Sequence, residues 1–293
     1  MNPPRSRRKF LVSLGTAPAA AEALAGQFPN AAPVPVARAG DSYLHSRKVL
    51  LWECTRREIR EALDSGRLRA AIVPTGSTEQ HNEHLAMIHD TASTLLVAQN
   101  AALQLYPQVI VATPVPVGVS PHWMERKGTL TLRRETFLAV VFDICESLKI
   151  HGLRTILILN GHGGNADPLK SEVLAWREKL GINIEVCSYW EAFTKENSSQ
   201  YMQSGFAMIP GHSAEFETSF ALAAFPERVH REGVDYSKVR LNLKNPKDAD
   251  DDRTYYNDSL LATAEKGEAL IRIAVDWTAD RMRRMIASQR GIR

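Results

Sequence analysis

Cysteine is scarce in this sequence, with three residues at wide spacing among 293. An odd number of separated cysteines predicts neither a disulfide framework nor a CxxC zinc site. Long apolar runs are also missing, so the sequence predicts no ordinary membrane span. The formal net charge is only +3, and a basic cluster in the first ten residues accounts for more than this excess. Because no basic stripe with interleaved aromatic residues follows that cluster, we do not expect nucleic acid as a partner.

The first forty residues differ from the rest in composition. The stretch SRRKFLVSLGTAPAAAEALAG contains the paired arginines Arg7 and Arg8 shortly before Phe10, followed by an alanine-rich segment. This arrangement resembles a twin-arginine export signal, which a receptor reads as an address and which predicts a periplasmic location. A basic tail without a targeting role is the alternative. We therefore assign residues 1–40 to a signal and linker, and residues 41–293 to a single folded domain.

After this segment the sequence alternates between helical patterns and short apolar runs. Helical spacing covers residues 55–66, 91–107, 133–152 and 166–181. Short apolar runs typical of buried strands cover residues 68–76, 108–118, 154–161 and 182–190. Such alternation predicts an α/β fold in which helices cover both faces of a mostly parallel central sheet. Residues 236–258 are polar with an acidic run, and we expect a surface loop there, before a last helix near the C-terminus.

Polar residues gather directly after two of the predicted strands. The first strand runs into PTGSTEQHNEHLAMIHDT at residues 74–91, and the third ends in NGHGGN at residues 160–165. The carboxyl ends of parallel strands share one edge of the sheet, where ligands bind in such folds. We therefore expect both loops to contribute to one site.

The side chains in these loops are of the kind that bind metals. The first loop supplies Glu79, His81 and Asp90, and the second supplies His162. Carboxylates and imidazoles together suit a divalent ion of intermediate hardness, such as zinc, manganese or iron. Asp90 could bridge two ions through its two carboxylate oxygens. The glycines around His162 allow a tight turn while the imidazole projects from the strand end.

Two other interpretations of these loops remain open at the level of sequence. GHGGNA fits a dinucleotide-binding turn between a strand and a helix, with Glu185 as the acid that would meet the ribose. An NAD(P)-dependent enzyme is therefore one alternative, although it leaves the cluster around Glu79 without a role. A metal-binding protein without catalytic activity is the other.

A third polar group occurs in GHSAEFETS at residues 211–219. His212, Glu215 and Glu217 lie where a helix is expected to begin, and carboxylates are favourable there for the helix dipole alone. The stretch does not match the G-x-S-x-G motif of a serine hydrolase, because Ala214–Glu215 stand where that motif needs glycine.

Taken in order, PTGSTEQHNEHLAMIHDT, NGHGGN and GHSAEFETS resemble the creatininase family of creatinine amidohydrolases, over residues 50–225. The resemblance implies a three-layer α/β/α fold and assembly as a homo-oligomer, a hexamer. It also implies hydrolysis of C–N bonds in cyclic or linear amides, by a water that bridges two divalent ions. The implied substrate is therefore a small-molecule amide, and the implied cofactors are two ions of zinc, manganese or iron per chain.

The same resemblance assigns roles by position. Glu79 and His162 would hold one ion and His81 the other, while Asp90 would bridge the two. His212 would act in catalysis by passing a proton to the leaving nitrogen, a usual role for an imidazole.

Several positions depart from the family pattern, and one of them concerns a metal ligand. Creatininase has a glutamate two residues after the histidine of its NGH motif, and this chain has Gly164 there. The second ion therefore needs a carboxylate from elsewhere in the chain. Glu217 is the candidate, and Glu215 is its rival.

Overall fold

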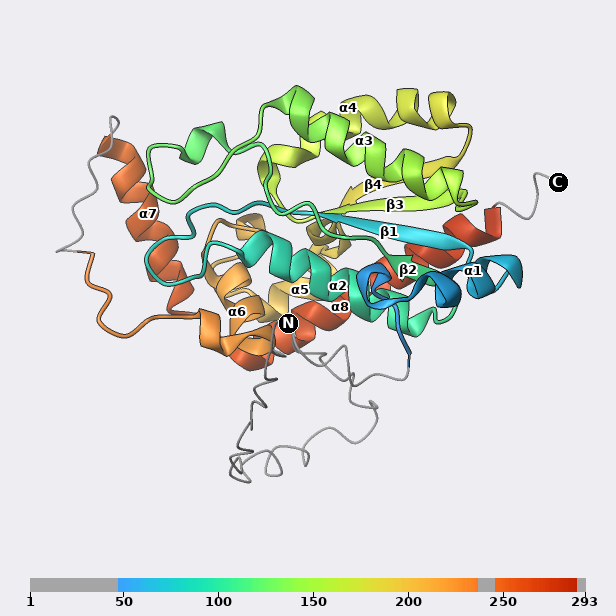
Figure 1. Cartoon of the computed structure of the whole chain (residues 1–293). Coiled ribbons are helices and arrows are strands. Elements are labelled where there is room, and N and C mark those ends of the chain that lie inside the picture. The colour runs from blue at the N-terminus through green and yellow to red at the C-terminus, as the bar shows by residue number, and fades with distance from the viewer. Residues whose placement is uncertain (1–46, 237–245, 289–293) are drawn as a thin grey trace, which may run out of the picture. The chain divides into compact units, whose positions relative to one another are not determined.

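The structure is a computed structural model that describes residues 47–236 and 246–288 (Figure 1). The predicted export signal and linker at residues 1–40 lie outside the described residues. Within the described ranges, no helix is both long enough and apolar enough to cross a membrane.

Four parallel strands form the central sheet, in the order β2-β1-β3-β4. The strands are β1 (Ala70–Thr75), β2 (Val109–Val111), β3 (Thr155–Asn160) and β4 (Asn183–Ser188). Every residue of β1, β2 and β3 is buried, which explains why these segments are continuous apolar runs rather than alternating ones. The predicted α/β class is confirmed, and the sheet is parallel throughout.

The second strand is shorter than the predicted range of residues 108–118. Pro114 and Pro116 have no N–H to donate to a ladder, so regular pairing ends at Val111. Val115 still makes an isolated parallel bridge to Thr75, which keeps this segment beside the end of β1.

Helices connect the strands and cover the sheet. They are α1 (Arg56–Asp64), α2 (His89–Gln104), α3 (Arg134–Ile150), α4 (Gly163–Leu180), α5 (Lys195–Ser198), α6 (Glu215–Ala224), α7 (Pro246–Ser259) and α8 (Ala264–Ser288). Short 3₁₀ turns are η2 (Leu51–Glu53), η3 (Pro121–Trp123), η4 (Tyr189–Ala192), η5 (Ser199–Tyr201), η6 (Phe206–Met208) and η7 (Pro226–Arg228).

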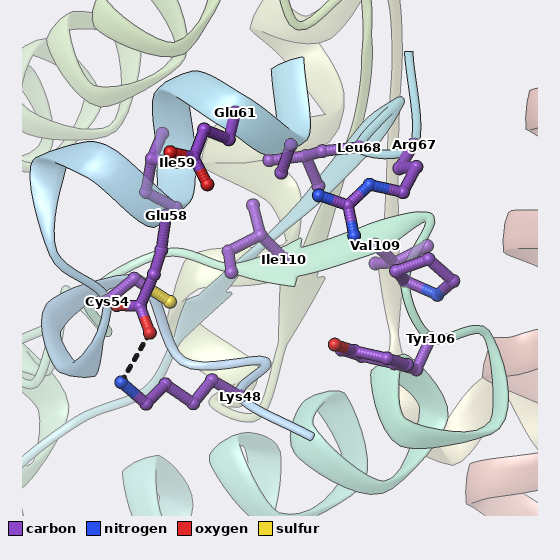
Figure 2. A pocket seen from close by; sticks show the side chains of 12 residues that line it. Lys48, Cys54, Glu58, Ile59, Glu61, Arg67, Leu68, Tyr106, Val109 and Ile110 are labelled. Atoms are coloured by element: carbon purple, nitrogen blue, oxygen red, sulfur yellow. Dashed lines mark hydrogen bonds and ion pairs between the residues drawn. The ribbon is translucent and has the colours of Figure 1, made fainter. Parts of the chain in front are cut away.

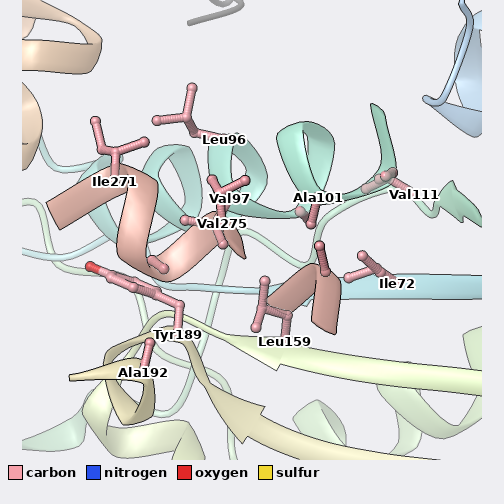
Figure 3. Packing of buried hydrophobic residues seen from close by; sticks show 14 of the residues in the cluster. Ile72, Leu96, Val97, Ala101, Val111, Leu159, Tyr189, Ala192, Ile271 and Val275 are labelled. Carbon is pink, nitrogen blue, oxygen red and sulfur yellow. The ribbon is translucent and has the colours of Figure 1, made fainter. Parts of the chain in front are cut away.

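The sheet has a separate hydrophobic core on each face, because successive strand residues point to opposite sides. On one face, Ile72 and Leu159 pack with residues of α2, α6 and α8 (Figure 3). On the other face, Val73 and Ile158 pack with residues of α1, α3 and α4. Figure 1 shows α3 and α4 on the opposite side of the strands from α2 and α8. The predicted layering of helices on both faces is therefore confirmed.

The strand order predicts a crevice beyond the ends of β1 and β3. Helix α2, which follows β1, and helix α3, which follows β2, pack on opposite faces of the sheet. Connections that diverge in this way leave a crevice outside the carboxyl ends of the two central strands. The loops after β1 and β3 meet at that crevice.

The predicted surface loop over residues 236–258 is wrong for its second half, because α7 covers residues 246–259. Asp252 in this helix is only 2% exposed and accepts two hydrogen bonds from Arg126, at 3.0 and 2.8 Å. Consecutive aspartates are typical of a solvated segment. Here one of them has a buried cationic partner 126 positions earlier in the chain, which no local pattern reveals.

Candidate metal centre

The loop after β1 folds back on itself and brings its polar residues to the start of α2. It turns at Asn82, whose φ of 55° lies in the left-handed region that asparagine tolerates. The Glu79 N–H donates to the Met87 carbonyl oxygen at 3.1 Å, which closes the loop. Asp90 lies in the first turn of α2, where the helix dipole favours a carboxylate.

The loop after β3 is held tightly against the same helix. Asn160 clamps it twice: its Oδ1 accepts from the His162 N–H at 3.1 Å, and its Nδ2 donates to the His162 carbonyl oxygen at 2.8 Å. A side chain at Gly161 would lie 2.6 Å from the Asp90 carbonyl oxygen, so this close approach requires glycine. His162 is thereby directed at Asp90.

The five residues predicted as metal ligands meet in one buried cluster. They are Glu79, His81, Asp90, His162 and Glu217. Asp90 lies between the two histidines: its Oδ1 is 3.0 Å from His81 Nε2, and its Oδ2 is 3.0 Å from His162 Nδ1. Glu79 Oε1 is 3.2 Å from His162 Nδ1, and Glu217 Oε2 is 3.6 Å from His81 Nε2. Each member is at most 5% exposed.

Hydrogen bonds to the backbone orient both imidazoles. His81 Nδ1 lies 3.1 Å from the Glu79 carbonyl oxygen, so that nitrogen carries a proton and Nε2 faces Asp90. His162 Nε2 lies 3.2 Å from the Val119 carbonyl oxygen, so Nδ1 faces the carboxylates instead. A donor on one ring nitrogen that frees the other for a cation is the usual arrangement around metal-ligating histidines.

The carboxylates of the cluster have more acceptor capacity than the protein satisfies. Glu79 Oε2 and Asp90 Oδ2 are buried without a hydrogen-bond partner among the described residues, although Asp90 Oδ2 lies at ion-pair distance from His162. Buried acceptors of this kind are costly unless a cation or donor meets them. The donor set therefore fits one or more divalent ions.

Burial and charge act against each other in this cluster. Burial alone would lower the pKa of His81, but the Asp90 carboxylate raises it to about 10. Burial likewise opposes the charged form of His162, and hydrogen bonds to Asp90 and Glu79 raise its pKa to about 10. Burial raises the pKa of Glu217 to about 8. The raised pKa values of His81, His162 and Glu217 mean that the cluster retains protons when no metal is bound. A divalent ion that binds would displace those protons.

The ligand atoms group into overlapping triads, two of which have no residue in common. Among the described residues, three triads have ligand atoms within 4.8 Å of one another: Glu79–His81–His212, Glu79–His122–His162 and His81–Asp90–Glu217. The last two triads share no residue, and Asp90 contacts a histidine of each. The buried clusters are therefore consistent with a binuclear site.

Glu215 points away from the cluster, unlike Glu217. It forms an ion pair with Lys266 and accepts hydrogen bonds from the Ser204 N–H and hydroxyl, each at 2.7 Å. Residues two apart on a helix differ in direction by roughly 200°, so the two glutamates of α6 face opposite sides. Glu217 Oε2 instead accepts from the Ser213 N–H at 2.6 Å, which aims the carboxylate at His81.

His212 lies at the mouth of the site, where it is 14% exposed. Its Nδ1 is 3.8 Å from Glu79 Oε1, and its ring stacks on Trp123 with centroids 4.3 Å apart. Gln80 Nε2 lies 2.8 Å from His212 Nε2. Burial lowers the pKa of His212 well below its usual value, so the imidazole is neutral. The sequence does not mark Gln80 or Trp123 as part of the site, because Gln80 is an uncharged amide between two predicted ligands and Trp123 lies outside the three motifs.

A cavity of about 160 Å³ opens between these groups. Four of the proposed ligands line it, all except His81, together with residues such as His122, Trp123, Trp190, Pro210 and His212. Aromatic walls around a few convergent polar groups are typical of small-molecule sites.

A larger hollow, of about 200 Å³, lies elsewhere (Figure 2). Residues such as Glu58, Tyr106 and Ile110 line it, and Figure 2 shows the Lys48–Glu58 ion pair there, at 2.7 Å. None of the proposed metal ligands is among its lining residues. Size alone therefore does not identify the functional site, and the chemistry points to the smaller cavity.

The dinucleotide interpretation of GHGGNA finds little support in the geometry. A side chain at Gly164 would lie 2.1 Å from the Val119 carbonyl oxygen, so the glycine makes room for the protein's own loop rather than for a phosphate. Glu185, the predicted ribose contact, pairs with Arg281 at 2.9 Å. His162, in the middle of the turn, faces carboxylates that would repel a phosphate.

Comparison with known proteins agrees with this arrangement. The family model for creatininase, described as creatinine amidohydrolase, matches residues 52–282. Creatinine amidohydrolase of Pseudomonas putida is 29% identical over 258 residues, which cover 81% of this chain and 97% of that protein. A mycofactocin precursor peptide peptidase of Mycolicibacterium smegmatis is 27% identical, over 75% of this chain and 87% of that protein. A 3-dehydro-scyllo-inosose hydrolase of Thermotoga maritima is 30% identical, over 61% of this chain and 57% of that protein.

Solved structures of creatininases share the fold. A mutant creatininase of the Zn-Zn type superposes with a TM-score of 0.69 at 24% identity, covering 82% of this chain and 99% of that chain. A manganese creatininase gives a TM-score of 0.67 at 24% identity, covering 81% and 98%. The predicted family resemblance is thus confirmed: this chain belongs to the creatininase family of hydrolases.

Proposed function

We propose that this chain hydrolyses a C–N bond of a small-molecule amide or cyclic amide, with two divalent metal ions bound at the buried cluster. The observation that supports this most directly is the position of Asp90, within 3.0 Å of both His81 and His162. One relative, matched over 97% of its length, is a creatinine amidohydrolase, whereas others are a peptidase and an inosose hydrolase. A cavity of about 160 Å³ suits a small amide better than a peptide chain.

The side chains divide between the two ions as follows. Glu79 and His162 would hold one ion, His81 and Glu217 the other, and Asp90 would contact both. Zinc, manganese or iron suits this mixture of carboxylates and imidazoles. The chemistry that bound ions would supply there is a water activated as nucleophile and a polarised carbonyl group of the substrate.

His212 is proposed to serve the leaving nitrogen. The Asn82 N–H donates to Gln80 Oε1 at 3.0 Å, which turns the Gln80 amide nitrogen toward His212 Nε2 at 2.8 Å. Neutral His212 therefore carries its proton on Nδ1, the atom that faces Glu79 and the cavity. From Nδ1 it can donate a hydrogen bond to the departing nitrogen. Because the neutral ring cannot give up this proton outright, its proposed contribution is the hydrogen bond to the departing nitrogen.

His212→Ala is expected to lower kcat by roughly 10²- to 10³-fold while the metal content stays unchanged, the usual effect of losing one hydrogen-bond donor in the transition state. His212 lines the cavity where the substrate would bind, so its loss should affect turnover. It is not one of the five proposed ligands, so bound metal should remain. Steady-state kinetics and elemental analysis of the same preparation check this, with the exposed His151→Ala as control. A loss of bound metal in His212→Ala would instead make His212 a ligand.

A substrate panel with and without metal tests the proposed function. Creatinine, linear formamides and short peptides should be assayed before chelation, after chelation, and after zinc or manganese is restored. We expect hydrolysis of at least one non-peptide amide that disappears with the metal and returns with it. Bound metal without turnover on any amide would favour the non-catalytic alternative.

We also infer that residues 1–40 direct export to the periplasm, because Arg7 and Arg8 precede an alanine-rich stretch. Replacing both arginines with lysine keeps the charge, so a general basic tail would tolerate the change. We expect the variant to accumulate in the cytoplasm, as measured by cell fractionation, while the unchanged chain reaches the periplasm. Assembly as a hexamer is likewise proposed, and light scattering of the purified 32.6 kDa chain would test it.

A further inference from the structure

Trp123, in the segment before α3, packs against the His212 ring, and Arg126 from the same segment packs against Trp123. Trp123 stacks on the His212 ring, with planes 23° from parallel. The Arg126 guanidinium carbon lies 4.5 Å from the centroid of the Trp123 ring, within the range of a cation–π contact. Arg126 itself is only 8% exposed.

Helix α7, from a distant part of the chain, contacts both this segment and the loop after β1 through Asp252. Asp252 accepts both hydrogen bonds from Arg126 in a bidentate pair. The Asp252 carbonyl oxygen also accepts from Asn82 Nδ2 at 3.0 Å, and Asn82 in turn orients Gln80. A closed circuit of contacts therefore returns to His212, and its members are Gln80, Asn82, Trp123, Arg126, Asp252 and His212.

We propose that the buried Arg126–Asp252 ion pair is a clamp that positions His212, by holding Trp123 against one side of its ring and Gln80 against its Nε2. This rests on the role of His212 in the proposed function. Two charges so deeply buried gain little net stability, because desolvation offsets their attraction. Their bidentate geometry instead fixes α7 relative to the segment of Trp123, and small misplacement of a reacting group has large effects on rate.

Asp252→Asn in the full chain is the first test. It keeps the shape of the side chain but removes the charge that pairs with Arg126. We expect kcat on the identified amide to fall about 10- to 100-fold with KM changed by less than about twofold, and the metal content to stay the same. Hydrogen–deuterium exchange should rise together in residues 246–259 and in residues 211–214. The control is Asp251→Asn, the same charge change at the neighbouring, exposed position of α7.

Trp123→Leu is the second test, and it leaves the ion pair in place if Asp252→Asn folds poorly. It should lower kcat similarly and raise exchange at residues 211–214, while residues 246–259 keep their wild-type exchange. Wild-type kcat and wild-type exchange at residues 211–214 in either folded variant would overturn the clamp. Because the exchange measurement needs no substrate, it still tests the clamp if the wild-type chain hydrolyses no amide.

Discussion

Asp90→Ala is expected to remove both metal ions together and to lower amide hydrolysis by roughly 10³-fold, equivalent to about 4 kcal/mol of transition-state stabilisation. Asp90 is the only one of the five proposed ligands within 3.0 Å of both histidines. Each ion would lose a negatively charged ligand in a buried site, where no water can replace it without cost. Elemental analysis and kinetics of the same preparation measure the two effects.

The control for Asp90→Ala is Asp64→Ala, which removes an exposed carboxylate at the end of α1. It should keep wild-type metal content and activity. If Asp90→Ala loses only one ion, the carboxylate does not bridge. If it keeps a full metal complement, the assignment of Asp90 as a ligand is wrong.

The second large effect is expected from a matched pair of variants in α6. Glu217→Gln should lose the ion held with His81 and lower kcat by roughly 10²- to 10³-fold, because the carboxylate aimed at His81 becomes a neutral amide. Glu215→Gln should keep both ions and most of the activity. It should instead lower the free energy of unfolding by roughly 1–3 kcal/mol, since Lys266 and Ser204 lose a charged partner.

The two variants make the same chemical change two residues apart on one helix. Metal analysis and denaturant unfolding of both therefore separate a ligand from a structural ion pair. If Glu215→Gln loses metal and Glu217→Gln does not, the assignment of the second ion is reversed. This would also require α6 to present its opposite side to the cluster.

The order of strands and helices could be predicted from the sequence, because fully buried parallel strands appear as short apolar runs between helices. The meeting of Glu79 and His162 also followed, since parallel strands end at one edge of the sheet. Choosing between Glu215 and Glu217 could not be settled in this way. Both lie at a helix start and both are buried, and only their long-range partners, Lys266 for Glu215 and His81 for Glu217, show which carboxylate faces the cluster.

Helix α7 could not be predicted either, because its contacts are also long-range. Its aspartates suggest a solvated loop, and the buried Arg126 that pairs with Asp252 lies 126 positions away. Long-range ion pairs leave no periodic pattern in a sequence. Gln80 was missed because an amide between two expected ligands resembles a spacer, although its orientation sets the proton position of His212.

The metal content of the purified full chain is the measurement that tests the central claim most directly. After reconstitution with zinc or manganese and removal of excess metal, we predict about two ions per chain, as in other two-metal hydrolases. His162→Ala and His81→Ala should each lose at least one ion, because the two loops form a single centre. No bound metal in the reconstituted wild-type chain, or metal that both variants retain, would contradict the account.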